Sequence, residues 1–232
     1  MAAQHSVGGF VPSQNGLHFP NRFPGVPLPG PLAQVIDTSK SVHGLCGGMC
    51  FTVIDHFKAG RPVPLVDAVP DGATPLYEYL SKRQWESWGL LGTEVLRYVQ
   101  WMTYSDKKAG AESFESWELL KGRLDADELT VIGLVYNDIR ETLRVWDNHQ
   151  VLAHGYTVQD NGAIHIHVYD PNYPNLDTVR IEATPVRFRR WFTLRTGLIS
   201  AQYVGQKKVH DIHGWMVVPY DYSPPPDDLG FG

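Results

Sequence analysis

The order of hydrophobic and polar residues is helical in the first half of the chain, after an initial stretch with almost no periodicity. From Cys46 onward, apolar side chains recur at steps of three and four residues up to Phe57, and Gly60 with Pro62 then ends the pattern. Shorter stretches with the same spacing follow. We therefore predict helices over residues 46–57, 75–88, 93–103 and 114–124.

The second half of the chain changes to runs rich in β-branched residues. Such runs are typical of strands, which we predict over residues 129–136, 150–158, 163–169, 177–182, 186–192 and 212–218. The second and third of these strands are joined by Gln159-Asp160-Asn161-Gly162, and Asn-Gly after an apolar strand is a strong hairpin signal. We expect an antiparallel sheet with a tight hairpin at this position.

The first forty residues contain six of the seventeen prolines and show neither the helical nor the strand pattern of apolar residues. We predict that this segment is an extended strap, packed on the core through Phe10, Leu17, Phe19 and Phe23. Helices followed by an antiparallel sheet indicate the α+β class, with a cleft where the two halves meet. The expected organisation is one domain over residues 1–232, with a strap (1–40), a helical lobe (41–125), a β lobe (126–220) and a flexible tail (221–232).

Composition and charge argue against several classes of protein. Hydrophobic residues make up 43% of the chain and charged residues 19%, which indicates a folded core rather than disorder. The formal net charge of −5 and the scattered Lys and Arg residues argue against nucleic acid as a partner. No apolar run approaches the roughly 18 residues of a membrane span, and the start lacks a signal-peptide pattern. We expect a cytoplasmic protein, or one exported without a cleavable signal, and no cofactor.

The chain has two cysteines, four residues apart in Cys46-Gly47-Gly48-Met49-Cys50. This spacing on a helix is unsuited to an unstrained disulfide, and no second Cys or His pair completes a zinc pattern, so we predict free thiols and no metal. Cys46 begins the predicted helix, where the helix dipole lowers a thiol pKa and free N–H groups can bind an oxyanion. Gly47 and Gly48 leave this end open to a substrate, whereas Cys50 lies one turn inside and is expected to be inert.

The base must come from ten histidines, and the predicted hairpin favours His149. His149 begins a strand, whereas His154 lies further along it with the opposite parity. The expected register places His149 opposite positions 172–174 of the next strand, close to Asp170. Asp170 and Asn172 share a face, and either could orient the imidazole. We prefer Asp170 because a carboxylate also stabilises the imidazolium.

These residues resemble the motifs of papain-like cysteine peptidases and of their bacterial relatives, the double-glycine bacteriocin-processing peptidases. Three segments carry the resemblance: Leu45-Cys46-Gly47-Gly48 is loosely similar to C-G-S-C-W, His149-Gln-Val-Leu-Ala-His-Gly155-Tyr156 to H-A-V-x-x-V-G-Y, and Val168-Tyr169-Asp170-Pro171 to V-x-D-P. The order Cys, His, Asp agrees as well. The resemblance implies a papain-like fold, in which the cysteine helix of an N-terminal helical lobe packs on an antiparallel sheet lobe. It also implies Cys46, His149 and Asp170 as the catalytic residues.

One position departs from the papain pattern. Papain-like enzymes carry a glutamine six residues before the nucleophile as an oxyanion donor, and Lys40 stands there in this chain. The backbone N–H of Cys46 would remain as one donor, and the second donor is open. The candidates for oxyanion or substrate contacts are Lys40, Ser41, His43, Gly47, Gly48 and Asn172.

Three functions are compatible with this pattern. The leading hypothesis is a papain-like thiol hydrolase, a cysteine peptidase that cleaves a peptide or other amide bond through an acyl-enzyme. An acyltransferase that passes the acyl group to an amine would use the same triad. The third hypothesis is a non-catalytic binding module of the same fold, motivated by Lys40 in place of glutamine. The expected partner is a peptide or another acyl-bearing substrate.

Overall fold

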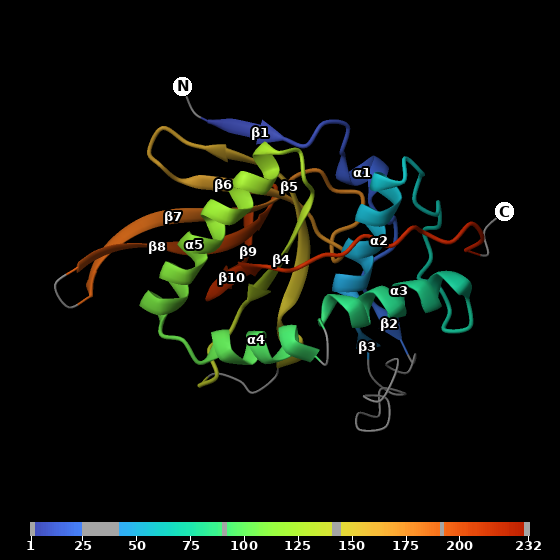
Figure 1. Cartoon of the computed structure of the whole chain (residues 1–232), viewed down its shortest axis with the longest axis horizontal. Helices are drawn as coiled ribbons and strands as arrows, with labels where there is room; N and C mark the ends of the chain where they lie inside the picture. Colours follow the sequence, from blue (N-terminus) through green and yellow to red (C-terminus); the bar gives the residue numbers. More distant parts are fainter. Residues whose placement is uncertain (1–2, 25–41, 90–91, 141–144, 191–192, 230–232) are drawn as a thin grey trace.

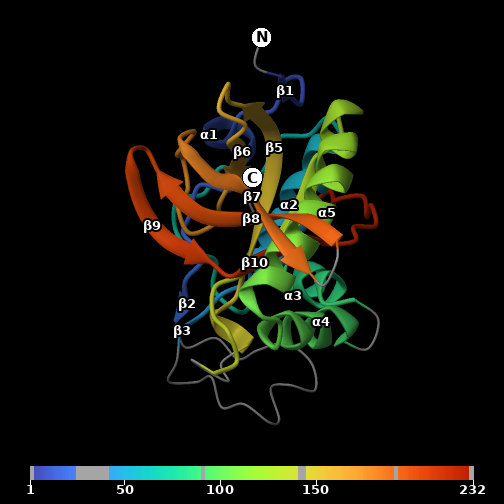
Figure 2. The same cartoon turned by 90° about the vertical axis from the view of Figure 1, so that its left-hand side faces the viewer.

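The computed structural model describes residues 3–24, 42–89, 92–140, 145–190 and 193–229. Within these ranges the chain forms five α-helices, an antiparallel sheet of eight strands and a separate two-stranded pair (Figure 1). Helices α2 to α5 lie to one side of the sheet, as Figure 2 shows. The α+β class is therefore confirmed.

The helix that begins at Cys46 is α2 (Cys46–Lys58), and it is almost wholly buried. Every residue from Gly47 to His56 is shielded from solvent. The helix ends before Gly60, whose φ of 64° lies in the left-handed region that favours glycine. The sequence predicted this helix to within one residue.

The remaining helices follow the predicted order. The side chain of Thr74 caps α3 by accepting a hydrogen bond from the N–H of Tyr77 at 3.2 Å. Among the described residues, no helix is both long and apolar enough to span a bilayer. The bounds are α1 (Pro12–Asn15), α3 (Pro75–Ser87), α4 (Thr93–Met102) and α5 (Asp106–Asp125).

Helix α5 begins eight residues before the predicted start, at Asp106 rather than at residue 114. Ser105 caps this start by accepting from the N–H of Lys108 at 3.4 Å. The first turns pack through small residues, and a Cβ at Gly110 would lie 2.8 Å from the carbonyl oxygen of Leu198. Such a close contact leaves no room for large apolar side chains. The first turns of α5 therefore lack the apolar residues at steps of three and four from which a helix is predicted.

The large sheet runs in the order β10-β4-β5-β6-β7-β8-β9 with antiparallel neighbours, and β1 adds to β5. The β5–β6 hairpin has the predicted register, since Leu152 faces Tyr169, which places residue 172 opposite His149. A one-turn 3₁₀ helix, Val145–Asp147, precedes β5. The strands are β1 (Gln4–Ser6), β2 (Phe23–Pro24), β3 (Val42–His43), β4 (Thr130–Val135), β5 (His149–Val158), β6 (Ile164–Tyr169), β7 (Val179–Arg190), β8 (Thr193–Val204), β9 (Lys207–Ile212) and β10 (Gly214–Val217).

Three strands differ from the prediction. Two predicted strands merge into β7, which continues through Pro185. Beyond Ala183, β7 has no register partner in β6 and pairs with β8 alone, so the missing N–H of Pro185 removes no bond on that side. Strands β8 and β9 were not predicted, and the predicted last strand, 212–218, corresponds to β10.

The two ends of the sheet are close together because β9 ends at Ile212 and β10 begins at Gly214. These strands pair with β8 and β4, which lie near opposite ends of the strand order. The indole Nε1 of Trp215 in β10 donates to Ser200 Oγ in β8 at 3.2 Å. The sheet therefore curls on itself and brings β8 and β9 toward the β4–β5 end.

The N-terminal strap packs on the core, as predicted, in the part from residue 3 to residue 24. Leu17, Phe19 and Phe23 are fully buried. The strap is not wholly irregular, because it contains β1 and α1, and the N–H of Val7 donates to the His154 carbonyl at 2.8 Å. The rest of the predicted strap, residues 25–40, lies outside the described residues.

The predicted flexible tail is packed where the structure describes it. Arg61 donates to the carbonyl oxygens of Pro225 and Pro226, both at 2.9 Å. The N–H of Ser223 donates to Asp55 in α2 at 3.2 Å, and Leu229 is buried. The C-terminal segment therefore lies on α2, and the sequence did not show this because its contacts involve backbone groups.

Gly48 allows α2 and α3 to approach closely, since a Cβ there would lie 2.1 Å from the Leu80 carbonyl oxygen. We expect Gly48→Ala to destabilise the protein by about 1–3 kcal/mol through overpacking. Gly122→Ala is the matched control: nothing lies within 4 Å of its Cβ position on the exposed side of α5, and it should stabilise by up to about 1 kcal/mol. Urea unfolding measures both. Equal stability of the two variants would contradict the close contact.

Candidate active site

Cys46 is the first residue of α2, and its side chain is partly exposed. Leu45 at the N-cap provides no side-chain hydrogen bond to the helix. In the first turn, the N–H of Gly48 donates to Gln84 Oε1 at 3.0 Å and that of Met49 to the Leu45 carbonyl at 2.8 Å. Within the described part of the chain no partner takes the N–H of Cys46. This group can therefore serve as an anion donor beside the thiol.

The two glycines after Cys46 have a different role from the predicted one. Both are buried, and a Cβ at Gly47 would lie 2.1 Å from Ser87 Oγ and 2.5 Å from Gln150 Oε1. These residues are glycine because α3 and β5 press against this face of α2. They position Cys46 through packing, and they are not exposed to a substrate as the sequence suggested.

His149 is the first residue of β5, and 5% of its surface is exposed. Its Nε2 lies 2.7 Å from Asp170 Oδ1, as the hairpin register predicted. With Nε2 turned toward the carboxylate, Nδ1 is the nitrogen that remains for the thiol. Cys46 is among the groups that raise the pKa of the ring, through hydrogen bonding and through charge. Sulfur, imidazole and carboxylate thus form one connected series.

Burial lowers the pKa of His149, but Asp170 and Cys46 outweigh burial and raise the pKa from 6.5 to about 10. Asp170 acts both through its charge and through its hydrogen bond. The imidazole is consequently protonated at neutral pH. A protonated imidazole beside a sulfur at a helix start is the environment that favours a thiolate.

Asp170 is itself held by Asn172, which the sequence had singled out, and by Gln202, which it had not. Its Oδ1 accepts from the N–H of Asn172 at 2.8 Å, and its Oδ2 accepts from Gln202 Nε2 in β8. Gln202 Oε1 in turn accepts from the hydroxyl of Tyr136 at 2.8 Å. These donors fix the carboxylate on the side of His149, and Gln202 reaches it because the sheet curls.

Asn172 lies beside the imidazole but does not orient it. The N–H of Leu45 donates to Asn21 Oδ1 at 2.6 Å, which fixes Asn21 Nδ2 as the donor to Asn172 Oδ1 at 3.2 Å. Asn172 therefore presents its Nδ2, a donor, to His149 Nε2 at 3.2 Å. A donor cannot accept the Nε2 proton, so the geometry favours Asp170 over Asn172 as the orienting group.

Cys50 and His154, the other cysteine and histidine of these two segments, lie in environments that do not favour a charged side chain. Cys50 is fully buried, its Sγ lies 3.7 Å from the Gln150 carbonyl, and burial raises its pKa well above the usual value. Burial lowers the pKa of His154 to about 4, and its ring packs on Phe10 at 5.4 Å. Both cysteines are free thiols, and among the described residues no group of three His, Cys, Asp or Glu side chains could hold a metal ion.

A cavity of about 450 Å³ opens beside Cys46 and His149. Its walls are polar, with four asparagines, one acid and one further histidine. These six residues are Asn21, Asn137, Asp147, Asn148, Asn172 and His210. The sequence singled out Asn172 alone, since the other five come from the strap, from the segment between β4 and β5, and from β9.

The predicted oxyanion candidates have different outcomes. Lys40 and Ser41 lie outside the described residues, and of His43 the structure describes the backbone, which pairs with Phe23. Gly47 is buried against α3. Asn172 lines the cavity, and so does Asn21 of the strap, which sequence reasoning missed because it precedes Cys46 by 25 positions.

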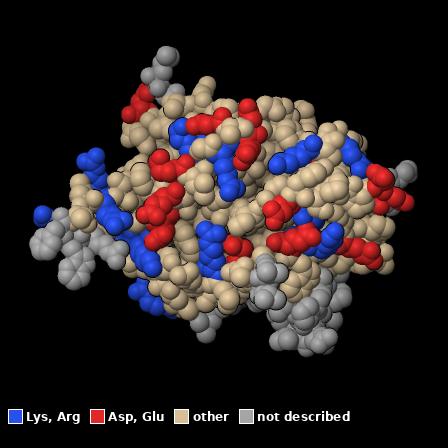
Figure 3. All heavy atoms as spheres, in the orientation of Figure 1, with Lys and Arg blue, Asp and Glu red and all other residues tan. Residues whose placement is uncertain are grey.

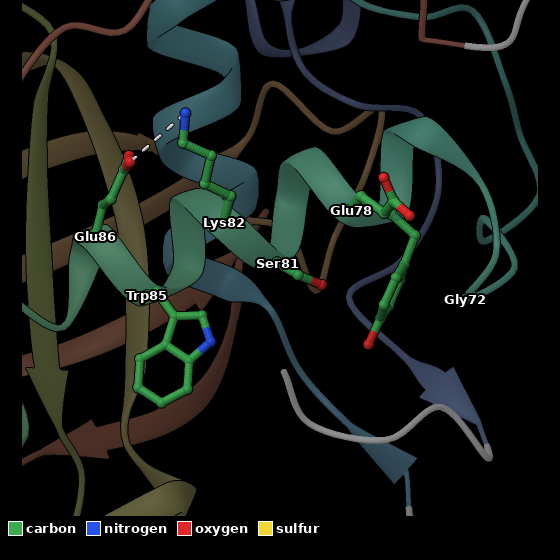
Figure 4. A pocket seen from close by; sticks show the side chains of 7 residues that line it. Gly72, Glu78, Ser81, Lys82, Trp85 and Glu86 are labelled. Atoms are coloured by element: carbon green, nitrogen blue, oxygen red, sulfur yellow. Dashed lines mark ion pairs between the residues drawn. The ribbon is translucent and has the colours of Figure 1, made fainter. Parts of the chain in front are cut away.

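Another hollow, of about 540 Å³, runs along α3, and Figure 4 shows its lining. Lys82 and Glu86 form an ion pair there at 4.0 Å, and Trp85 and Ser81 border the space. The residues that line it include no cysteine or histidine. On the face drawn in Figure 3, acidic and basic side chains are interspersed. The cavity at Cys46 is thus the candidate active site.

Comparisons with known proteins add nothing to this geometry. No protein-family model, curated protein or solved structure matches the chain.

Proposed function

We propose that this protein is a papain-like thiol hydrolase that cleaves a peptide or other amide bond through an acyl-enzyme. The observation that carries the proposal is the bond of 2.7 Å between His149 Nε2 and Asp170 Oδ1, which leaves the other ring nitrogen for Cys46. Packing alone does not explain a buried, charged histidine beside a core cysteine. Burial of such a charge is costly unless a carboxylate compensates for it.

The proposed reaction has two steps. The Cys46 thiolate attacks the carbonyl carbon, a C–S bond forms, and the oxygen takes the negative charge. His149 then gives its proton to the leaving nitrogen as the C–N bond breaks. In the second step His149 removes a proton from water, the resulting hydroxide attacks the thioester, and the thiolate leaves. Asp170 orients the ring through both steps.

The cavity walls suggest the kind of substrate. Amide side chains line the cavity at Asn21, Asn137 and Asn172, and amides are groups that form hydrogen bonds. Such groups suit the backbone and polar side chains of a peptide better than an apolar acyl chain. We therefore propose that polar groups flank the scissile bond.

Alkylation by iodoacetamide at pH 6–7 tests the proposal. Cys46 should be labelled roughly a hundredfold faster than Cys50 or more, because it is partly exposed beside the His149 imidazole whereas Cys50 is buried. Mass spectrometry of the digested protein measures each rate. In Cys46→Ala the fast phase should disappear, whereas in Cys50→Ala it should persist. Slow labelling of both cysteines at equal rates would instead indicate a non-catalytic module.

A further inference from the structure

We infer that Asn21, a residue of the N-terminal strap, supplies the second oxyanion donor of the site; this inference rests on the proposed function. A tetrahedral intermediate at Cys46 needs two donors aimed at its oxygen. The Cys46 N–H can be one of them. The strap brings the amide of Asn21 to the same cavity, which Cys46, His149 and Asn21 line together.

Three hydrogen bonds hold Asn21 in place, from both halves of the molecule. Its N–H donates to the Pro171 carbonyl at 2.9 Å, beyond the end of β6. Its Oδ1 accepts from the N–H of Leu45 at 2.6 Å, and its Nδ2 donates to Asn172 Oδ1 at 3.2 Å. Asn21 is thus anchored to Leu45, directly before Cys46, and to Pro171 and Asn172, directly after Asp170.

The same bonds decide which end of the amide faces the substrate. A backbone N–H can donate only to an acceptor, so the oxygen of Asn21 must lie on Leu45. The nitrogen then has two hydrogens, and Asn172 Oδ1 takes one of them. Within the described part of the chain no acceptor takes the second hydrogen, which can serve an acceptor in the cavity, such as the oxygen of a carbonyl under attack.

Gly44 shows how closely this amide approaches the chain before Cys46. A Cβ at Gly44 would lie 2.6 Å from Asn21 Nδ2 and 3.0 Å from Asn21 Oδ1. The absence of a side chain at position 44 is therefore required for the amide to lie there. Gly44 precedes Cys46 by two residues, and Asn21, Gly44 and Cys46 all line the same cavity.

Two reactions of Cys46 separate this role from the formation of the thiolate. Iodoacetamide needs the thiolate but passes through no oxyanion, whereas p-nitrophenyl acetate acylates the thiolate through one. We expect Asn21→Ala to lower the acylation rate by about 10² to 10³-fold and to leave alkylation within about twofold. Gly44→Ala, which displaces the same amide, should have the same two effects.

Asn15→Ala is the matched control, because Asn15 is another strap asparagine that accepts a backbone N–H, from Val11 at 2.8 Å, away from the cavity. It should change neither rate. An unchanged ratio of the acylation rate to the alkylation rate in Asn21→Ala would overturn the inference. So would a ratio of these two rates in the folded wild-type protein that is no higher than in the urea-unfolded chain. A parallel fall of both rates would make Asn21 a residue that positions the thiol, which also overturns it. Slow wild-type alkylation would instead refute the proposed function.

Discussion

Replacing Asp170 with asparagine is expected to lower acylation of Cys46 by on the order of 10⁴-fold, the loss seen when a catalytic histidine loses its carboxylate. Asp170 opposes the effect of burial on His149, so without it we expect the imidazole pKa to fall from about 10 to below neutrality. The ring is then neutral at pH 7, and the thiolate loses the charge that stabilises it. Stopped-flow acylation and an NMR titration of His149 measure the two effects.

The direction in which the His149 pKa changes distinguishes this explanation from simple misfolding. Wild-type His149 should keep its proton at pH 7 and lose it as the pH rises through about 10. In Asp170→Asn the proton should be lost on the acidic side of neutrality, while Cys46 alkylation at pH 6–7 falls as well. Asp160→Asn, in the exposed hairpin turn, is the control and should behave like wild type. Acylation within tenfold of wild type in Asp170→Asn would exclude Asp170 as the orienting group.

The proximity of His149 and Asp170 could be predicted because it depends on local geometry. A tight turn at Gly162 fixes the register of β5 and β6, and the register alone brings the two side chains together. The helix start at Cys46 is equally local, since it follows from the spacing of apolar residues. Such features need few residues and little knowledge of the whole fold.

The groups around this pair depend on contacts between distant segments. Gln202 reaches Asp170 from β8, a strand that was not predicted, and Tyr136 reaches Gln202 because the sheet curls. Asn21 arrives from a proline-rich strap without periodicity. Neither curling nor the path of a strap has a signature in the spacing of residues. The sequence could therefore indicate the residues of the candidate site but not the groups that hold them in place.

The two glycines at Cys46 show how a correct observation can be assigned the wrong cause. Glycine at the start of a helix costs about 1 kcal/mol relative to alanine, so its presence requires a reason. The sequence suggested access for a substrate. The structure gives packing, because Ser87 and Leu80 of α3 approach Gly47 and Gly48 to distances that no side chain would allow. The position of the thiol thus depends on how firmly α3 is held against α2.

A buried ion pair supports that contact. Arg83 of α3 and Asp55 of α2 are 2% and 0% exposed, and Arg83 Nε lies 2.7 Å from Asp55 Oδ2. The hydroxyls of Tyr79 and Tyr220 donate to the same carboxylate at 2.8 and 2.6 Å. Burial and the bond to Asp55 raise the pKa of both tyrosines, so both remain donors. The C-terminal segment joins this cluster, since Arg83 also donates to the Asp221 carbonyl at 2.8 Å.

We expect Arg83→Met to destabilise the protein by about 3–5 kcal/mol, because it leaves the charge of Asp55 buried without its partner. Urea unfolding measures the change, and alkylation of Cys50 should accelerate as α3 loosens over α2. Arg61→Ala is the matched control, because Arg61 binds the same C-terminal segment but is itself partly exposed. This replacement should lower the free energy of unfolding by at most about 1 kcal/mol. Asp55→Asn with Arg83→Met should destabilise less than Arg83→Met alone, since no buried charge remains. A loss below 1 kcal/mol in Arg83→Met would mean that water reaches Asp55, and α3 would then not be fixed by this pair.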